Sequence, residues 1–438
     1  MTRNFQRVPL KRTRRLMALM IGSQVSWWFF LFYLGRVEDP FQVALLTLTV
    51  GVLSFVVPST LIQSFSKLPD RTAFFCASVF LAVVIQIFFL TPRTFGDAQG
   101  LVAASEILWT RGPEHFASHY FSLPFLGSVH PPLGAVVYTP WIGAFGVSMG
   151  VLAFFSSFVG VLIVYLSFLF TRRAFSRDIA VLSVVCLFGC RHFWLYLCTP
   201  GLDGLLAVGV LLFMLGMTSR RTTLATVGFG IAIFSKYIGL FLVLTAPAWR
   251  ESDQRRRFMK AIGVGAFLFC FWLGAVVRDG RQLAPISRHL LVSPVFTQKG
   301  EIVKQPTGAP VIATSHLQKS SWYKKRFTYY IGFFLSQGPA FLLLFLASCR
   351  TLTSNKEFPP ELRCWLGAFF ALILLLPISR YFAAALPAAC AVVGLALQGV
   401  EPGWRYRILL FQICTALIAV SQYPAVPYNN LVEITGAS

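Results

Sequence analysis

Residues 202–250 decide how the chain is arranged: LDGLLAVGVLLFMLGMTSRRTTLATVGFGIAIFSKYIGLFLVLTAPAWR. Three short apolar runs, at 204–218, 222–235 and 238–249, are separated by Arg220 and Arg221 and by the single Lys236. If 222–249 crosses a membrane twice, Lys236 lies at the outer tip of a hairpin. If it crosses once, Lys236 lies in the middle of the membrane. A lone lysine at that depth is energetically expensive, which favours the hairpin.

The whole chain has this apolar character. Of its 438 residues, 56% are hydrophobic and only 12% are charged, whereas a soluble domain has about 25% charged residues. These figures exclude a disordered chain, a collagen-like fibre and a secreted disulfide scaffold. The net charge of +22 comes from basic residues between the apolar runs, so we expect contacts with anionic lipid headgroups rather than nucleic acid. The chain is predicted to be a polytopic membrane protein.

The hydropathy pattern predicts thirteen membrane spans, most of them near the 20 or so residues that cross a bilayer and three of them, 204–218, 222–235 and 238–249, shorter. They lie at roughly 16–35, 41–65, 72–91, 149–170, 179–198, 204–218, 222–235, 238–249, 259–277, 328–348, 364–378, 382–398 and 408–424. The first is too long for a cleavable signal peptide and follows a basic N-terminus, which predicts a retained helix with its N-terminus in the cytoplasm. Thirteen spans place 23 Lys and Arg on the cytoplasmic side and 15 on the other. A single crossing by 222–249 gives 23 against 14, so the positive-inside rule does not separate the two arrangements.

Two polar stretches are long enough to hold chemistry, at about 91–150 and 278–326. Within the first, the apolar segment Pro132 to Phe145 is broken by Pro and Gly, and we expect it to lie along the membrane surface. The nine cysteines fall in or beside apolar runs and show no paired zinc-type spacing, which indicates buried packing.

The thirteen-span arrangement places several polar residues on the same, non-cytoplasmic face. They are Asp97, His130, Asp203, Lys236, Arg380 and Tyr381. Each has a plainer interpretation: the two Asp as helix N-caps, the His as an exposed turn residue, and the Lys and Arg as cations that reach to headgroups. Together, however, they suit transfer of a group from a lipid phosphate. A carboxylate deprotonates an acceptor hydroxyl, and Lys and Arg neutralise the departing phosphate. A Gly-rich nucleotide-binding loop is absent from the sequence.

The motifs resemble the GT-C glycosyltransferases that use polyprenyl-phosphate sugars, the group of the protein O-mannosyltransferases and lipid A aminoarabinose transferases. The resemblance covers roughly residues 72–400 and follows an ordered series: Gly96-Asp97-Ala98, His130-Pro131-Pro132-Leu133-Gly134, Leu202-Asp203-Gly204, Phe234-Ser235-Lys236-Tyr237 and Arg380-Tyr381-Phe382. It implies an all-α, GT-C-like bundle of about thirteen transmembrane helices with surface helices in the first outer loop. It also implies an N-terminal helical hairpin addition (1–71), a catalytic module (72–326) and C-terminal transmembrane helices (327–438).

The same resemblance implies roles for the polar residues. Asp97 looks like the catalytic base and Asp203 like a second acid near it. Lys236 and Arg380 look like ligands of the donor phosphate, with His130 and Tyr381 lining the site. The family often has a second acid directly after the first, where this chain has Ala98, and Val129-His130 replaces the Glu-Lys of the aminoarabinose transferases. A divalent metal ion is therefore left open.

The sequence thus predicts a membrane enzyme that moves a single sugar from a polyprenyl phosphate to a hydroxyl acceptor of a lipid, glycan or protein. A transporter or flippase for an anionic lipid or lipid-linked sugar is the alternative, since it also needs intramembrane charges, but no repeat of the kind common in transporters is evident. A bacterial inner membrane, with the site facing outward, is preferred over the endoplasmic reticulum because the loops are compact and the chain has no Asn-x-Ser/Thr sequon.

Overall fold

The computed structural model describes residues 8–33, 39–56, 69–89, 96–119, 131–146, 149–198, 201–278, 338–354, 358–375 and 379–422. All regular structure in these ranges is helical. The helices are α1 (Leu10–Tyr33), α2 (Pro40–Val56), α4 (Asp70–Phe89), α5 (Gly96–His119), α6 (Leu133–Phe145), α7 (Met149–Ala174), α8 (Arg177–Phe188), η2 (Phe193–Leu197), α9 (Leu202–Thr218), α10 (Thr222–Ser235), η3 (Tyr237–Ala248), α11 (Ser252–Arg278), α14 (Pro339–Ser354), α15 (Pro360–Leu375), η5 (Ser379–Ala385), α16 (Leu386–Leu397) and α17 (Pro402–Gln422).

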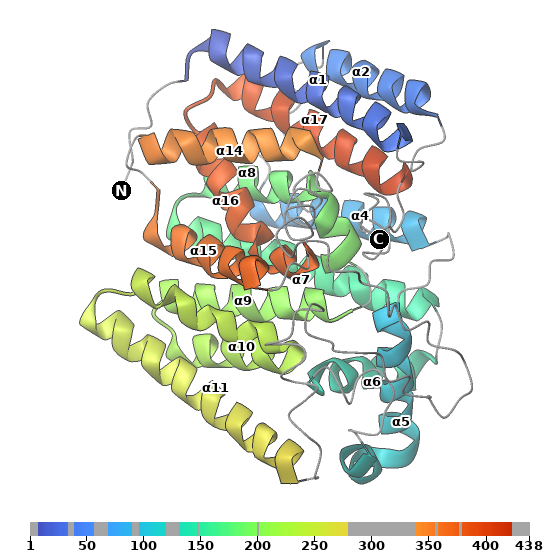
Figure 1. Ribbon diagram of the computed structural model, residues 1–438, viewed down its shortest axis with the longest axis vertical. Helices are drawn as coiled ribbons and strands as arrows, with labels where there is room; N and C mark the ends of the chain where they lie inside the picture. The colour runs from blue at the N-terminus through green and yellow to red at the C-terminus, as the bar shows by residue number, and fades with distance from the viewer. Residues whose placement is uncertain are drawn as a thin grey trace, which may run out of the picture.

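The apolar composition of these helices agrees with a membrane protein. Among the described residues, three helices are long and apolar enough to cross a membrane, namely Leu10–Phe32, Phe154–Ala174 and Pro402–Val420, and eight more are shorter and apolar. Figure 1 shows them packed side by side, with α1, α2 and α17 at one edge and α9, α10 and α11 at the other. The predicted all-α membrane fold is confirmed, while the count of thirteen crossings stays a prediction.

The segment 222–249 doubles back, as the hairpin arrangement predicts. Helix α10 ends at Ser235, Lys236 is extended, and η3 returns along α10. A Cβ atom on Gly239 would lie 2.5 Å from the backbone carbon of Ala232, so the two segments are in direct contact. At the opposite end, Arg220 and Glu251 are 3.7 Å apart. The chain therefore returns to the side from which it started, and a single crossing is ruled out for this segment.

The unusual length of η3 has a simple geometric origin. Its 12 residues form a 3-10 helix, which rises about 2.0 Å per residue, or about 24 Å in all. The 14 residues of α10 form an α-helix, which rises about 1.5 Å per residue, or about 21 Å. The tighter helix lets a short segment match the length of its partner.

Helices α9 and α10 pack with their backbones in contact. A Cβ on Gly209 would lie 2.4 Å from the backbone nitrogen of Ala232, and one on Gly216 would lie 2.3 Å from that of Ala225. Small residues at such positions allow close helix approach inside a membrane. This close packing holds the two ends of the α9–α10 pair in a defined register.

The predicted span 179–198 is wrong as a single helix. Helix α8 ends at Phe188, and a π-helix, η2, begins at Phe193. The backbone released by the break finds side-chain partners: the Gln412 amide donates to the Gly189 carbonyl at 2.8 Å, and the Trp194 indole donates to the Phe188 carbonyl at 2.8 Å. A broken helix at membrane depth is tolerated when protein groups satisfy its backbone in this way.

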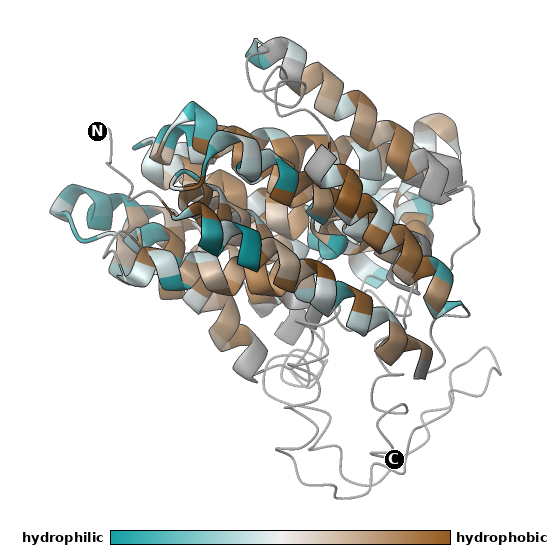
Figure 2. Cartoon of the chain, turned by 90° about the horizontal axis from the view of Figure 1, so that it is seen from above, coloured by the Kyte–Doolittle hydropathy of each residue, from teal (hydrophilic) through white to brown (hydrophobic). Residues whose placement is uncertain are grey.

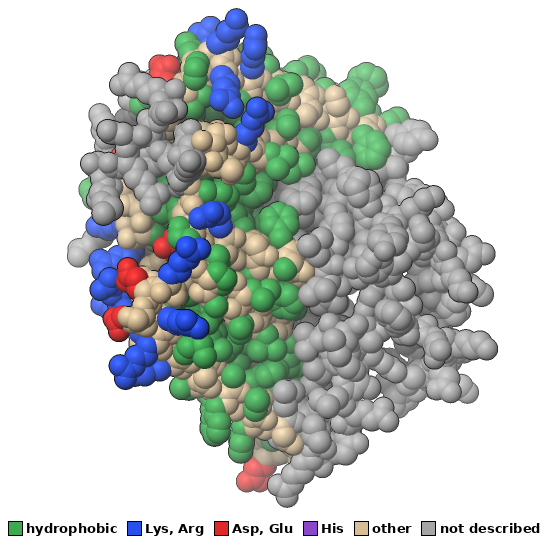
Figure 3. All heavy atoms as spheres, turned by 60° about the vertical axis from the view of Figure 1, so that its left-hand side comes forward, with side chains coloured by type: hydrophobic (Ala, Val, Ile, Leu, Met, Phe, Trp, Pro, Cys, Tyr) green, Lys and Arg blue, Asp and Glu red, His purple; other side chains and the backbone are tan. Residues whose placement is uncertain are grey.

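Basic side chains gather at one end of the bundle, called the basic end below. It includes the end of α7, the starts of α8, α15 and α17, and the α9–α10 and η3–α11 turns, which carry Arg172, Arg177, Arg220, Arg250, Arg363 and Arg405. Figure 2 shows hydrophobic residues along the helices and hydrophilic ones toward their left-hand ends. Figure 3, in which that side comes forward, shows the Lys and Arg side chains clustered there. This distribution fits the predicted cytoplasmic face.

Candidate active site

The candidate site lies at the end of the α9–α10 pair that is opposite the basic end. Because α9 and α10 are antiparallel, the first turn of α9 and the residue after α10 lie together. These positions carry Asp203 and Lys236, which lie about 25 Å from the α9–α10 turn, given the 17 residues of α9. Of the polar residues predicted from the sequence, Asp203 and Lys236 therefore lie together at this end.

Asp203 and Lys236 form a buried ion pair. The Lys236 Nζ donates to Asp203 Oδ1 at 2.6 Å, and the two side chains are only 2% and 9% exposed. Lys236 therefore does not extend to lipid headgroups. Asp203 is not the N-cap of α9 either, because that position belongs to Gly201 and no side chain caps the helix. Both of the plainer interpretations are wrong for this pair.

Helix α6 closes the same end of the bundle against α9. The backbone N–H of Gly201 donates to the hydroxyl of Tyr138 on α6 at 3.1 Å. A Cβ on Gly134 would lie 2.2 Å from a methyl group of Leu202 and 2.9 Å from one of Leu101. The first turn of α6 thus meets α5 and the start of α9 at one point, which only a glycine allows without displacing them.

This meeting point also places the backbone of Asp97. Asp97 is in the first turn of α5, four residues before Leu101. Leu101 and Leu202, the residue before Asp203, both lie close to Gly134 of α6. Helix α5 therefore packs against α6, and the start of α9 approaches the same glycine of α6. The side chain of Asp97 lies outside the described part of the structure, and so does the whole of His130.

Arg380 and Tyr381 belong to η5, which packs against α9 and η2. Helix α15 begins at the basic end, where Arg250 and Arg363 lie near Cys364, and its 16 residues extend about 24 Å to the other end. The backbone of η5 is therefore at the same end as Asp203. The side chains of Arg380 and Tyr381 are outside the described part.

The sequence analysis missed three buried polar residues near this end. Tyr138 is 1% exposed, and its hydroxyl holds the start of α9. Arg191 and His192, at 6% and 0% exposure, lie just before η2. Both were inside the predicted span 179–198, and two adjacent basic residues in an apolar run were the signal that could have identified them.

A metal centre is not assembled by the described side chains. Within the described ranges, no three His, Cys, Asp or Glu side chains lie close enough together to hold a metal ion. The free thiols of Cys190 and Cys390 are 3.6 Å apart inside the bundle, between α8 and α16. They lie among packed helices, as predicted, whereas Cys76 and Cys270 are exposed, so the prediction of buried packing is wrong for these two.

No family model and no curated protein matches the chain. Among solved structures, ArnT from Cupriavidus metallidurans bound to undecaprenyl phosphate matches 77% of this chain and 62% of its own, with a TM-score of 0.56 and 16% identity. Its apo state matches 75% and 60%, with a TM-score of 0.52 and 16% identity. The oligosaccharyltransferase of Archaeoglobus fulgidus in the apo form matches 81% and 56%, at a TM-score of 0.48 and 14% identity.

At these identities the likeness concerns the fold, and the chain spans 62% of the length of ArnT. ArnT is an aminoarabinose transferase of the GT-C class, which the motif series resembles. The chain therefore has the GT-C fold of ArnT, as the sequence predicts.

Proposed function

We propose that this protein is an inverting membrane glycosyltransferase that transfers one sugar from a polyprenyl phosphate to an acceptor hydroxyl. The acceptor oxygen attacks the anomeric carbon of the sugar and forms the new glycosidic bond. The bond from that carbon to the phosphate oxygen breaks, and the polyprenyl phosphate leaves with the electron pair. The acceptor proton passes to a carboxylate.

The observation that carries this proposal is the buried Asp203–Lys236 pair at one end of a GT-C fold. A buried ion pair costs desolvation energy and is weak evidence for a stabilising role. A lysine ammonium group binds phosphate as a point charge. The structure of ArnT that shares this fold was solved with undecaprenyl phosphate bound, which is the leaving group of the proposed reaction.

The proposed roles of the individual residues follow the motif series of the sequence. Asp97 is the base that receives the acceptor proton, and Lys236 and Arg380 bind the departing phosphate and neutralise its charge. Asp203 holds Lys236 in place before the donor arrives. His130 and Tyr381 line the site. In this reaction, Lys236 and Arg380 supply the positive charge that neutralises the leaving phosphate. If a divalent ion also takes part, EDTA should lower the rate of turnover.

The test uses the full chain in proteoliposomes with undecaprenyl phosphates that carry a radiolabelled sugar. Lipids, glycans and proteins of the native membrane are supplied as acceptors, with the site expected to face outward from a bacterial inner membrane. Appearance of label on an acceptor together with free undecaprenyl phosphate supports the proposal. Movement of an intact fluorescent lipid-linked sugar between leaflets, without sugar loss, would support the transporter instead.

Thermal unfolding with undecaprenyl phosphate alone gives a measurement that does not need the acceptor. A ligand at 100 times its Kd stabilises the folded state by about 2.7 kcal/mol. We expect such a shift for the native protein and its loss in Lys236→Met. An equal shift in both proteins would remove Lys236 from the phosphate site.

A further inference from the structure

A second polar cluster lies far from the candidate active site, at the basic end where α16 turns into α17. This cluster, called the Trp404 corner, consists of residues 398–407 and Arg14 of α1. The backbone N–H of Val8 donates to the Gly399 carbonyl at 2.8 Å, which fixes the start of α1 against the corner. Trp404 lies at the centre of the Trp404 corner and is only 6% exposed.

Two arginines share the ring of Trp404. The guanidinium carbon of Arg14 lies 5.8 Å from the ring centre and that of Arg407 lies 5.3 Å from it. Each distance is within the range of a cation–π contact. The contacts come from two helices, α1 and α17, that are far apart in the sequence. The corner therefore gathers two positive charges at one point on the protein surface.

Nothing in the described part of the chain neutralises these charges. Neither Arg14 nor Arg407 pairs with a described acidic side chain, and Glu401, the nearest acid in sequence, is exposed and makes no described ion pair. Arg405 differs, since it donates to the carbonyls of Val400 and Gln398 at 2.6 and 2.7 Å. Two like charges beside one ring favour binding of an anion.

The corner also holds hydrogen-bond donors without an acceptor. Arg407 Nε is buried and has no hydrogen-bond partner among the described residues, and the same holds for Gln398 Nε2. Leaving such a donor unsatisfied is unfavourable, and native proteins rarely leave one. The missing partner is an acceptor, and the neighbouring charges select a negatively charged one.

We propose that the Trp404 corner binds the phosphodiester group of an anionic phospholipid in the leaflet at the basic end. Tryptophan and arginine are typical of the level of the headgroups, and basic pockets between transmembrane helices on the cytoplasmic side bind anionic headgroups. The planar guanidinium groups match the geometry of phosphate oxygens. The lipid would join α1 to α17, and this site is independent of the proposed transferase activity.

The test titrates the detergent-solubilised full chain with dioctanoyl phosphatidylglycerol and measures affinity from the shift in Tm. Arg14→Gln removes one of the two cations from an exposed position, so the fold is retained. We expect at least a fivefold loss of affinity. Arg15→Gln is the matched control because Arg15 is exposed, adjacent on α1 and has no described contact with the ring. We expect less than a twofold change in this control.

A second variant, Arg407→Lys, keeps the charge but loses the planar donors, and we expect it also to weaken binding at least threefold. Equal losses in the Arg14 and Arg15 variants would overturn the proposal, because they would indicate diffuse surface charge. Equal binding of dioctanoyl phosphatidylcholine, or of inorganic phosphate, would overturn the assignment to an anionic lipid. Lys236→Met should leave phosphatidylglycerol binding unchanged, which separates this site from the proposed active site.

Discussion

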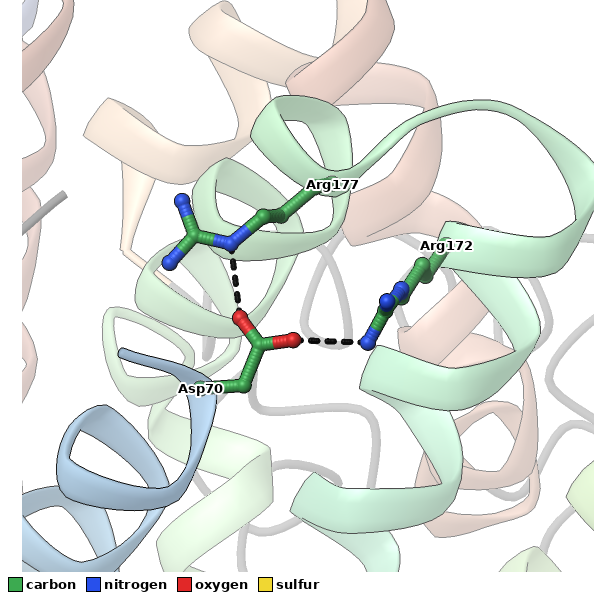
Figure 4. Close-up of polar contacts among 3 residues, drawn as sticks. All are labelled: Asp70, Arg172 and Arg177. Carbon is green, nitrogen blue, oxygen red and sulfur yellow. Dashed lines mark hydrogen bonds and ion pairs between the residues drawn. The ribbon is translucent and has the colours of Figure 1, made fainter. Parts of the chain in front are cut away.

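The two ends of the bundle hold ion pairs of the same length in different surroundings. At the candidate site, Lys236 and Asp203 are 2.6 Å apart and almost fully buried. At the basic end, Asp70 contacts both Arg172 and Arg177 at 2.6 Å, but the carboxylate is 33% exposed and the arginines 51% and 35% (Figure 4). The contact distances are equal, so the two ends differ in burial and in the number of cations on each carboxylate, not in distance.

Burial changes what each pair does for the protein. An exposed pair is screened by water and contributes little to stability, typically about 0–1 kcal/mol. A buried pair repays its desolvation only in part, yet loss of one partner leaves an uncompensated charge and costs about 3–5 kcal/mol. The Asp70 cluster therefore mainly orients α4 against α7 and α8. Loss of either partner of the Asp203–Lys236 pair is costly, so the fold depends on keeping both charges. One of them belongs to Lys236, the cation that we propose binds the phosphate.

The largest effect is expected at the site end, from Asp97→Asn. The amide cannot accept a proton, and loss of a general base lowers rates by about 10²–10⁴-fold. Initial rates of sugar transfer should fall by that factor, while undecaprenyl phosphate still raises the Tm as in the native protein. Turnover within tenfold of the native rate would remove Asp97 as the base.

Lys236→Met tests whether loss of one partner of the buried pair destabilises the protein. We expect the free energy of unfolding to drop by about 3–5 kcal/mol, because the Asp203 carboxylate is left buried without its counter-ion. The double variant with Asp203→Leu should recover most of this stability but not the binding of undecaprenyl phosphate. Chemical unfolding in detergent provides the measurement. A single variant as stable as the native protein would show that the pair is not closed in solution.

Arg380→Ala should weaken donor binding and leave stability nearly unchanged. A hydrogen bond to a charged group contributes about 1.5–3 kcal/mol, which corresponds to a loss of about 10–150-fold in affinity for undecaprenyl phosphate. Arg363→Ala is the control, since Arg363 is exposed and lies at the opposite end of α15. Similar losses in both variants would indicate a general effect of charge rather than a contact at the site.

The smallest effect is expected at the basic end, from Asp70→Asn. Because the cluster is partly exposed, the free energy of unfolding should fall by about 1 kcal/mol or less, with transfer activity unchanged. The difference from the native protein should shrink further in 1 M salt, where the Debye length is about 3 Å. A loss above 3 kcal/mol would mean that the exposed Asp70 cluster stabilises the protein as much as the buried Asp203–Lys236 pair.

Much of the architecture could be predicted because apolar composition acts locally. Most of the described helices between 10 and 422 follow the predicted spans, apart from α5, α6 and the broken α8–η2 segment, and the cost of a lone lysine was enough to predict the turn at Lys236. The break after Phe188 could not be predicted. Its backbone depends on Gln412, which is 223 residues away in the chain, and nothing near residue 189 signals that partner.

The candidate site also has a part that the sequence predicts and a part that depends on tertiary contacts. The motif series identified Asp97, His130, Asp203, Lys236, Arg380 and Tyr381 as candidates, and the thirteen-span arrangement assigned them one face. The sequence could not show that Lys236 bonds to Asp203 rather than to headgroups. That outcome depends on backbone contact between α9 and α10 at Gly209 and Gly216, and on η3 folding back over α10 at Gly239.

The sequence by itself determined that this chain is a bundle of apolar helices with more of its basic residues on one side, because the transfer of side chains from water is a local property of each segment. Only the tertiary structure decided which charges meet, in the buried pair and around Trp404. Such meetings depend on the close approach of segments far apart in the chain, which no local pattern encodes.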